Sequence, residues 1–294
     1  TRQPFPNNVI PPNRLDPVGR NLVNLYALPN QPGTVDGRNN YFRALMAEED
    51  YYVHFGRVDH AFSDNNRMFV RAHYDFWEED KNRHFDNDVN GLILNRINRG
   101  VAVDDVHVRG SMVFNLRYGF TQQEFPEHRT SIGTDLAALG FSPALVNLVV
   151  DPELATIPRI RAGGYSAISP WETGDGTTES LTHTFVGGFN TLRGRHNLKG
   201  GADFRIYRAL GNRYPQSVSP DLNFTSTYTR GPFDNSSAAP IGQELASMLL
   251  GIPDGLMVRP ASFVIRDRYL GAYVHDDFQV SSRLTLNMGL RYEL

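Results

Sequence analysis

From Tyr51 to the C-terminus, apolar and polar residues alternate with a period of two, which is the spacing of side chains on the two faces of a β-strand. In the clearest run, Leu284–Glu293, leucine, methionine or tyrosine alternates with threonine, asparagine, glycine, arginine or glutamate. Similar runs occupy residues 67–76, 112–121, 181–189 and 197–206. The pattern predicts an all-β chain, an antiparallel meander whose strands each have one apolar and one polar face.

The runs last about 9 to 13 residues, whereas strands of globular proteins average about 5 to 6. A tilted strand needs about 9 to 11 residues to cross a bilayer, so the length favours a large transmembrane β-barrel. Tight polar turns are predicted at 63–66, 108–111, 193–196 and 280–283. Long loops are predicted near 78–95 and 126–178, and we expect them to be extracellular, because outer-membrane barrels have short turns inside and long loops outside.

Aromatic residues cluster at the strand ends away from these turns, as in the interfacial girdle of a barrel. They are Tyr74, Phe76, Trp77, Tyr118, Phe120, Phe125 and Tyr292.

The composition is compatible with a membrane barrel. Charged residues make up 21% of the chain, and no apolar run reaches the roughly 18 residues that a spanning helix needs. The mean hydropathy of −0.40 fits a barrel, because only alternate strand residues face lipid. A formal net charge of −3 gives no indication of nucleic-acid binding, and the absence of cysteine excludes disulfides and thiol chemistry.

Residues 1–50 lack the alternation and are expected to be irregular, with one short helix. Asp16 before Pro17 is typical of a helix start, and Pro29 would end the helix. A short strand around Tyr41–Ala44 is also compatible with the sequence.

Residues 210–265 leave two arrangements open. Residues 223–229 and 256–264 have the composition of strands, and 241–250 of a short helix. Either both strands belong to the barrel, or the region is one long excursion outside the membrane. The barrel part then has roughly eight to ten strands.

Residues 273–293 resemble a characteristic hairpin of TonB-dependent receptors. In that family a Tyr-Val-Gln-Asp-Asp-Trp strand turns into Leu-Thr-Leu-Asn-Leu-Gly-Leu-Arg-Tyr-Glu. The chain keeps this order, with His275 in place of the usual glutamine and Phe278 in place of the usual tryptophan.

Further segments resemble the Oar-like subgroup of these receptors, and they occur in family order. They are the hairpin at 56–71, the strand at 196–205 and the segment at 246–253. Residues 10–18 and 25–30 resemble the segment that joins the plug domain to the barrel. The resemblance implies a plug-to-barrel connecting segment at 1–50 and the N-terminal part of the β-barrel at 51–294.

The resemblance also implies the location, the partners and the function. The chain would form barrel wall and ligand-capturing loops of a TonB-dependent transporter in the bacterial outer membrane, in contact with outer-membrane lipid. A plug domain and TonB would act through an N-terminal part that this sequence lacks. Transporters of this class close about 22 strands around a plugged lumen, so we expect a fragment with an open, curved sheet. The ligand stays open among an iron chelate, an oligosaccharide and a peptide.

The polar strand faces carry mixed charges, which on a wet wall pair with one another and with a plug. We expect the following side chains to face the lumen. They are Arg71, Asp75, Asn115, Arg117, Lys199, Asp203, Arg205, Asn287, Arg291 and Glu293. The alternative is the solvated face of a soluble sheet.

The sequence predicts no catalytic, cofactor or metal site. Asp86–Gly91 imitates the start of a calcium loop, but its twelfth position is Ile97 instead of glutamate, which favours a polar surface loop. Asp276 and Asp277 are adjacent in a strand, so they point to opposite faces and do not form an acid pair. The histidines lack the spacing of a common zinc motif: His54, His60, His73, His84 and His107.

Two other functions share parts of this pattern. A passive porin or an adhesive surface barrel has the same strands, and a plug with a TonB box in the same protein would exclude it. A soluble β-rich binding or hydrolytic protein would stay in solution without detergent. We expect the chain to be no enzyme and to need no cofactor.

Overall fold

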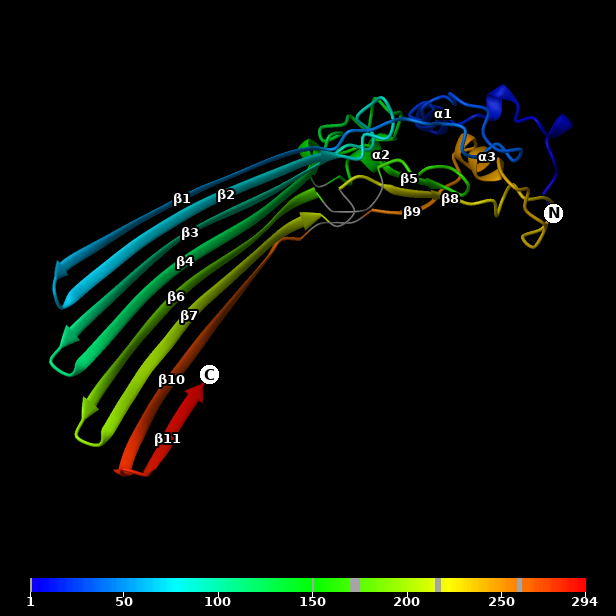
Figure 1. The fold of residues 1–294 in the computed structure, drawn as a ribbon. Helices are drawn as coiled ribbons and strands as arrows, with labels where there is room; N and C mark the ends of the chain where they lie inside the picture. The colour runs from blue at the N-terminus through cyan, green and yellow to red at the C-terminus, as the bar shows by residue number, and fades with distance from the viewer. Residues whose placement is uncertain (1, 150, 170–174, 215–217, 258–260) are drawn as a thin grey trace.

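The computed structural model describes residues 2–149, 151–169, 175–214, 218–257 and 261–294. Eight antiparallel strands form one long curved sheet, and the helices and a small second sheet gather at one end of it (Figure 1). The order β1-β2-β3-β4-β6-β7-β10-β11 pairs each strand with its successor in the sheet, while β1 and β11 form its two open edges. This open meander confirms the predicted all-β, incomplete barrel.

The strands of the large sheet are 10 to 19 residues long, as long as or longer than a membrane crossing requires. They are β1 (Glu48–Ser63), β2 (Asn66–Lys81), β3 (Leu92–Arg109), β4 (Met112–Arg129), β6 (Asp175–Arg193), β7 (His196–Tyr214), β10 (Phe263–Ser281) and β11 (Leu284–Glu293).

All four predicted tight turns are confirmed, and they lie together at the end of the sheet opposite the helices (Figure 1). The two predicted long loops are shorter than expected. The first occupies only 82–91, and the second starts after Arg129 and ends before Asp175. The strands extend into the predicted loops because their hydrogen bonds come from the backbone and do not require an apolar face. Residues 78–81, for example, are polar and still pair with β1 and β3.

Four stretches of chain fold together at the other end of the sheet, and we call this unit the cap. It comprises the described parts of 2–47, 82–91, 130–169 and 218–257. Its small sheet has the order β5-β8-β9, with β5 (Arg159–Ala162), β8 (Asp221–Phe224) and β9 (Asp254–Leu256). Its helices are α1 (Pro17–Val23), α2 (Pro143–Val146) and α3 (Gln243–Leu249), with 3-10 turns η1 (Pro6–Asn8), η2 (Pro12–Arg14) and η3 (Pro152–Leu154). No helix in the described parts of the chain is long and apolar enough to cross a membrane.

The cap decides between the two arrangements of the region after β7. Both β8 and β9 belong to the small sheet, so this region is one long excursion from the large sheet and adds no strand to it. The predicted helix is present as α3. Of the stretch predicted as a strand at 256–264, residues 258–260 lie outside the described residues.

One hydrophobic core joins all four stretches of the cap. Leu22 comes from the N-terminal stretch and Met248 from α3, and both are almost completely buried. The other buried core residues are Phe85, Val89, Leu136, Phe141, Val149, Ala155, Ile160, Ala162, Ile168, Val218, Leu222 and Phe224. A shared core of this kind holds the long loops as one folded body.

The start of α1 is as predicted, but its end is not. Asp16 caps the helix by accepting a hydrogen bond from the Gly19 amide at 2.7 Å. The helix ends at Val23, well before Pro29, and Tyr26 in the turn that follows packs against Phe85. Glycine is required inside α1, since a Cβ on Gly19 would lie 2.0 Å from the carbonyl oxygen of α3 residue Met248.

The predicted strand at 41–44 is absent. The backbone of Phe42 instead exchanges hydrogen bonds of 2.7 and 2.8 Å with the side chain of Asn30, so it has no need of a strand partner.

Candidate functional site

The register sorts the side chains of the large sheet into two faces, because directly paired residues share a face. The apolar positions of all five predicted runs fall on one side, which we call the apolar face. One row of paired residues on this face is apolar across every strand. It consists of Val58, Val70, Val103, Tyr118, Phe185, Phe204, Leu270 and Leu294.

The described part of the chain leaves the apolar face without a covering layer. Leu286, Met288 and Leu290 are 44%, 49% and 73% exposed, although they belong to the strongest apolar run. An apolar sheet face of this extent suits hydrocarbon and is an aggregation hazard in water. Two strand carboxylates of this face lie between the continuous apolar row and the tight turns, and each has a partner: Asp105 accepts from Asn66 at 3.1 Å, and Asp276 lies 2.7 Å from His196.

Most of the predicted aromatic girdle lies on the apolar face. Tyr74, Phe76, Tyr118, Phe120 and Tyr292 are all there, and the rings of Tyr118 and Phe185 lie 5.0 Å apart. Trp77 and Phe125 lie on the opposite face. Trp77 directly follows Phe76, and Phe125 is five residues after Phe120, and an odd separation along a strand puts two side chains on opposite faces. The interfacial prediction is therefore wrong for these two.

All ten residues predicted to face the lumen lie on the second side of the sheet, which we call the charged face. These are Arg71, Asp75, Asn115, Arg117, Lys199, Asp203, Arg205, Asn287, Arg291 and Glu293. Their position on a lumen wall stays a prediction.

Arginine–carboxylate pairs neutralise the charged face along its own strands. Arg57 pairs with Asp59 at 2.7 Å, and the Arg205 Nε atom lies 3.0 Å from the carboxylate of Asp203. Arg291 pairs with Glu293 in the same way. Each pair is two residues apart, which is the spacing that puts both side chains on one face of a strand.

Two carboxylates that connect neighbouring strands were not among the predicted residues. Asp104 is 5% exposed and accepts from Arg117 at 2.6 Å and Asn115 at 3.0 Å. Asp277 accepts from Lys199 at 3.1 Å and lies 2.7 Å from His275. Both are on the charged face, where they connect β3 with β4 and β7 with β10.

The structure agrees with the interpretation of the acidic motifs as surface groups. Asp276 and Asp277 contact different partners on opposite faces, as predicted. In the loop that imitates a calcium site, Asp86 pairs with Arg43 at 3.0 Å and Asp88 with Arg83 at 2.6 Å. Within the described residues, no group of three or more histidines and carboxylates is arranged to hold a metal ion.

The cap contains a recess of about 640 Å³ between its N-terminal stretch and its loops. Four aromatic rings line it in a chain of contacts: Tyr41–Phe85 at 5.7 Å and Tyr26–Tyr165 at 6.4 Å are edge-to-face, and Tyr26–Phe85 at 5.9 Å is tilted, all measured between centroids. The size is in the range of small-molecule sites.

Hydrogen-bonding capacity is available inside this recess. The Tyr26 hydroxyl is buried, has no partner among the described residues, and has a pKa raised to about 12 by burial and by Tyr165. The one cation of the lining, Arg38, is neutralised by Asp36 at 3.3 Å and also donates to the Pro240 carbonyl at 3.2 Å. None of the described lining residues carries a carboxylate. The recess is therefore neutral and aromatic, and its Tyr26 hydroxyl is available to hydrogen-bond a ligand.

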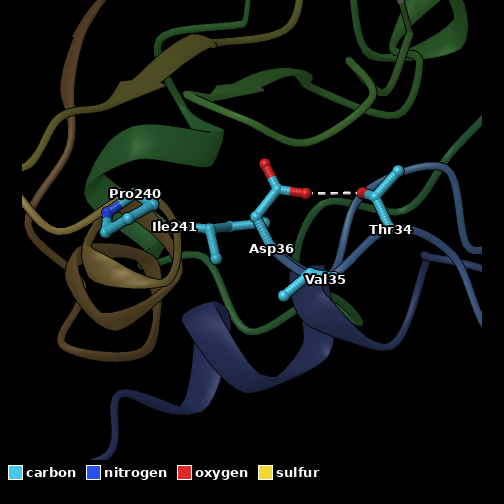
Figure 2. Close-up of a pocket in the computed structure, with 5 residues that line it drawn as sticks. All are labelled: Thr34, Val35, Asp36, Pro240 and Ile241. Atoms are coloured by element: carbon cyan, nitrogen blue, oxygen red, sulfur yellow. Dashed lines mark hydrogen bonds between the residues drawn. The ribbon is translucent and has the colours of Figure 1, made fainter.

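A second recess, of about 630 Å³, shares Ile241 with the first and is more open to solvent. Figure 2 shows the five residues that line it. Thr34, Val35 and Asp36 form one side of it, and Pro240 and Ile241 the other. The Thr34 hydroxyl donates to Asp36, which lowers the pKa of that carboxyl. This bond closes a turn at the surface, so we regard the first recess as the better ligand site.

Comparison with known proteins places the fold. The family model described as an outer membrane beta barrel domain matches residues 1–294. Among solved structures, the chain is similar to the outer membrane transporter YddB from Escherichia coli, with a TM-score of 0.53 and 12% identity. That match covers 89% of this chain and 29% of the transporter, so the chain spans less than a third of its length. No curated protein matches. The chain therefore belongs to the outer membrane β-barrel domain family and is a protein of the bacterial outer membrane.

Proposed function

We propose that the chain forms wall and ligand-capturing loops of a TonB-dependent transporter. The observation that carries this proposal is the combination of an uncovered apolar face, a charged face with paired arginines, and a folded cap over one end of the sheet. The hairpin at 273–293 that resembles TonB-dependent receptors, and the likeness to an outer membrane transporter, support it further.

In this proposal the charged face lines the lumen, where its ten predicted residues contact water and a plug domain. The arginine–carboxylate pairs suit such a wall, because they leave it polar without a strong net charge. A passive porin or an adhesive barrel is the alternative, since either would use the same wall.

The proposed orientation puts the tight turns in the periplasm and the cap outside the cell. Strand β1 then runs inward from the cap, because it starts beside the cap and ends at the first tight turn. The stretch 2–47 shares the core of the cap through Leu22. That position favours an outer-surface role for this stretch over the plug-to-barrel connection that the resemblance implies.

The aromatic recess of the cap is the proposed capture site. Its neutral lining suits an uncharged ring, such as a sugar of an oligosaccharide or an aromatic side chain of a peptide. The highly charged groups of many iron chelates would find no free counter-charge there, because Arg38 is already paired with Asp36.

Uptake measurements test the function. Cells that produce the protein in its outer-membrane form are given labelled oligosaccharides, labelled peptides or a labelled iron chelate, with and without a functional TonB. We expect accumulation of one of the first two classes, and we expect it to fall to the level of cells lacking the protein when TonB is deleted.

Each other result has a defined meaning for the proposal. Uptake that persists without TonB indicates a passive porin. Accumulation of only the iron chelate keeps the transporter but contradicts the capture site. A protein that stays soluble without detergent contradicts both the transporter and the passive porin.

A further inference from the structure

Three arginines form an exposed cluster on the apolar face. Arg208 of β7 pairs directly with Arg266 of β10, and Arg268 is two residues further along β10. All three side chains are exposed. They lie on the face that the proposed transporter turns toward lipid.

The cluster has no internal compensation. Like charges directly opposite each other destabilise a sheet, yet none of the three guanidinium groups forms a hydrogen bond or ion pair with any residue that the structure describes. Glu179, the nearest carboxylate across β6 and β7, accepts from Gln122 at 2.9 Å. By contrast, Arg99 on the same face is paired with Glu124.

The position of the cluster is at one border of the apolar zone. Arg268 is paired with Ile206, in the row next to the continuous apolar row that contains Phe204 and Leu270. Arg208 and Arg266 lie one row further toward the cap. With the cap outside the cell, this border is the level of the outer-leaflet headgroups.

We propose that Arg208, Arg266 and Arg268 bind the phosphate groups of an anionic lipid in the outer leaflet. A guanidinium donates two parallel hydrogen bonds to a phosphate, and an anion between two opposed arginines removes their repulsion. A site at headgroup level on the apolar face selects a phosphate that is attached to lipid. This inference rests on the proposed orientation but not on TonB or on the transported ligand.

The test compares two pairs of substitutions on the same face of the intact protein, purified in detergent. Arg208→Gln/Arg266→Gln removes the two directly opposed arginines of the cluster, whereas Arg109→Gln/Arg193→Gln removes exposed arginines beside the tight turns. Native mass spectrometry measures binding of lipid A, of the same lipid without phosphates, and of inorganic phosphate.

We expect the first pair to weaken lipid A binding by about tenfold or more, since it removes the charge-assisted hydrogen bonds of two guanidinium groups to phosphate. The second pair should have little effect, and the lipid without phosphates should bind weakly to every form. Should the glutamine pair fail to fold, Arg208→Lys/Arg266→Lys keeps the charge and is expected to weaken binding partially.

Three results would overturn the proposal. These are equal losses in the two glutamine pairs, full binding of the lipid without phosphates, and inorganic phosphate that competes at the concentration of the lipid. Loss of TonB-dependent uptake would leave the lipid result unchanged, so the two proposals fail separately.

Discussion

Replacement of Val70 by arginine is expected to destabilise the membrane-inserted protein by about 2–4 kcal/mol, the cost of arginine facing hydrocarbon near the middle of a barrel strand. Val70 lies in the continuous apolar row, between Val58 of β1 and Val103 of β3. No carboxylate is paired with it in that row. Asp105, the nearest carboxylate on this face, is one row nearer the tight turns and already accepts a hydrogen bond from Asn66, so the new guanidinium would meet lipid without a directly opposed carboxylate.

The neighbouring substitution Phe69→Arg is the matched control. Phe69 is on the charged face, where the register places it opposite Asp59 on one side and Asp104 on the other. An arginine there faces two carboxylates, so we expect a change within about 1 kcal/mol. Urea unfolding in lipid vesicles measures both, and equal losses or the reverse order would contradict the assignment of the two faces.

Cysteine substitutions are expected to place the cap outside the cell and the tight turns inside. The chain has no cysteine, so each introduced thiol is the only one within it. The fully exposed Val35 of the cap and the exposed Asp64 of the first tight turn are suitable positions. A maleimide on a polyethylene glycol chain too large for porins should label the Val35→Cys protein in intact cells.

The same reagent should label Asp64→Cys only after the outer membrane is permeabilised. The expected difference is close to all or none, because one thiol is on the surface and the other is behind the membrane. Labelling of Asp64→Cys alone in intact cells would place the cap in the periplasm, and it would also remove the outer-leaflet assignment of the arginine cluster.

The alternation in sequence was sufficient to predict both faces of five strands. Period-two patterns report directly on which side chains share a face, so the predicted lumen residues fall together on the charged face. The start of α1 was predictable for a similar reason, since the Asp16 cap and the following proline are local signals.

Strand β3 was the main omission among the barrel strands. Its apolar-face positions include Arg99 and Asp105, while its charged-face positions include Ala102 and Val106. Each face therefore mixes polar and apolar residues, and no clear period is visible. Asp104 of β3 was not predicted either, because its contact is with Arg117 of the neighbouring strand β4 and is not visible in the local sequence.

The cap was beyond prediction for a different physical reason. Its core joins four stretches of chain that are far apart in sequence, and its strands β8 and β9 have only 4 and 3 residues. Such short elements are stabilised by tertiary packing and leave no local period. The aromatic recess likewise depends on Tyr26, Phe85 and Tyr165 meeting across three of these stretches.

Nitroxide scanning of β4 tests most directly whether successive side chains face lipid and water in turn. Each residue from 112 to 121 is replaced by cysteine, spin-labelled in the membrane-inserted protein, and exposed to oxygen or to a polar nickel complex. Labels at Phe114, Leu116 and Tyr118 should collide mainly with oxygen, and labels at Asn115 and Arg117 mainly with nickel. A profile without this alternation, or with the opposite phase, would show that the sheet is not a membrane wall.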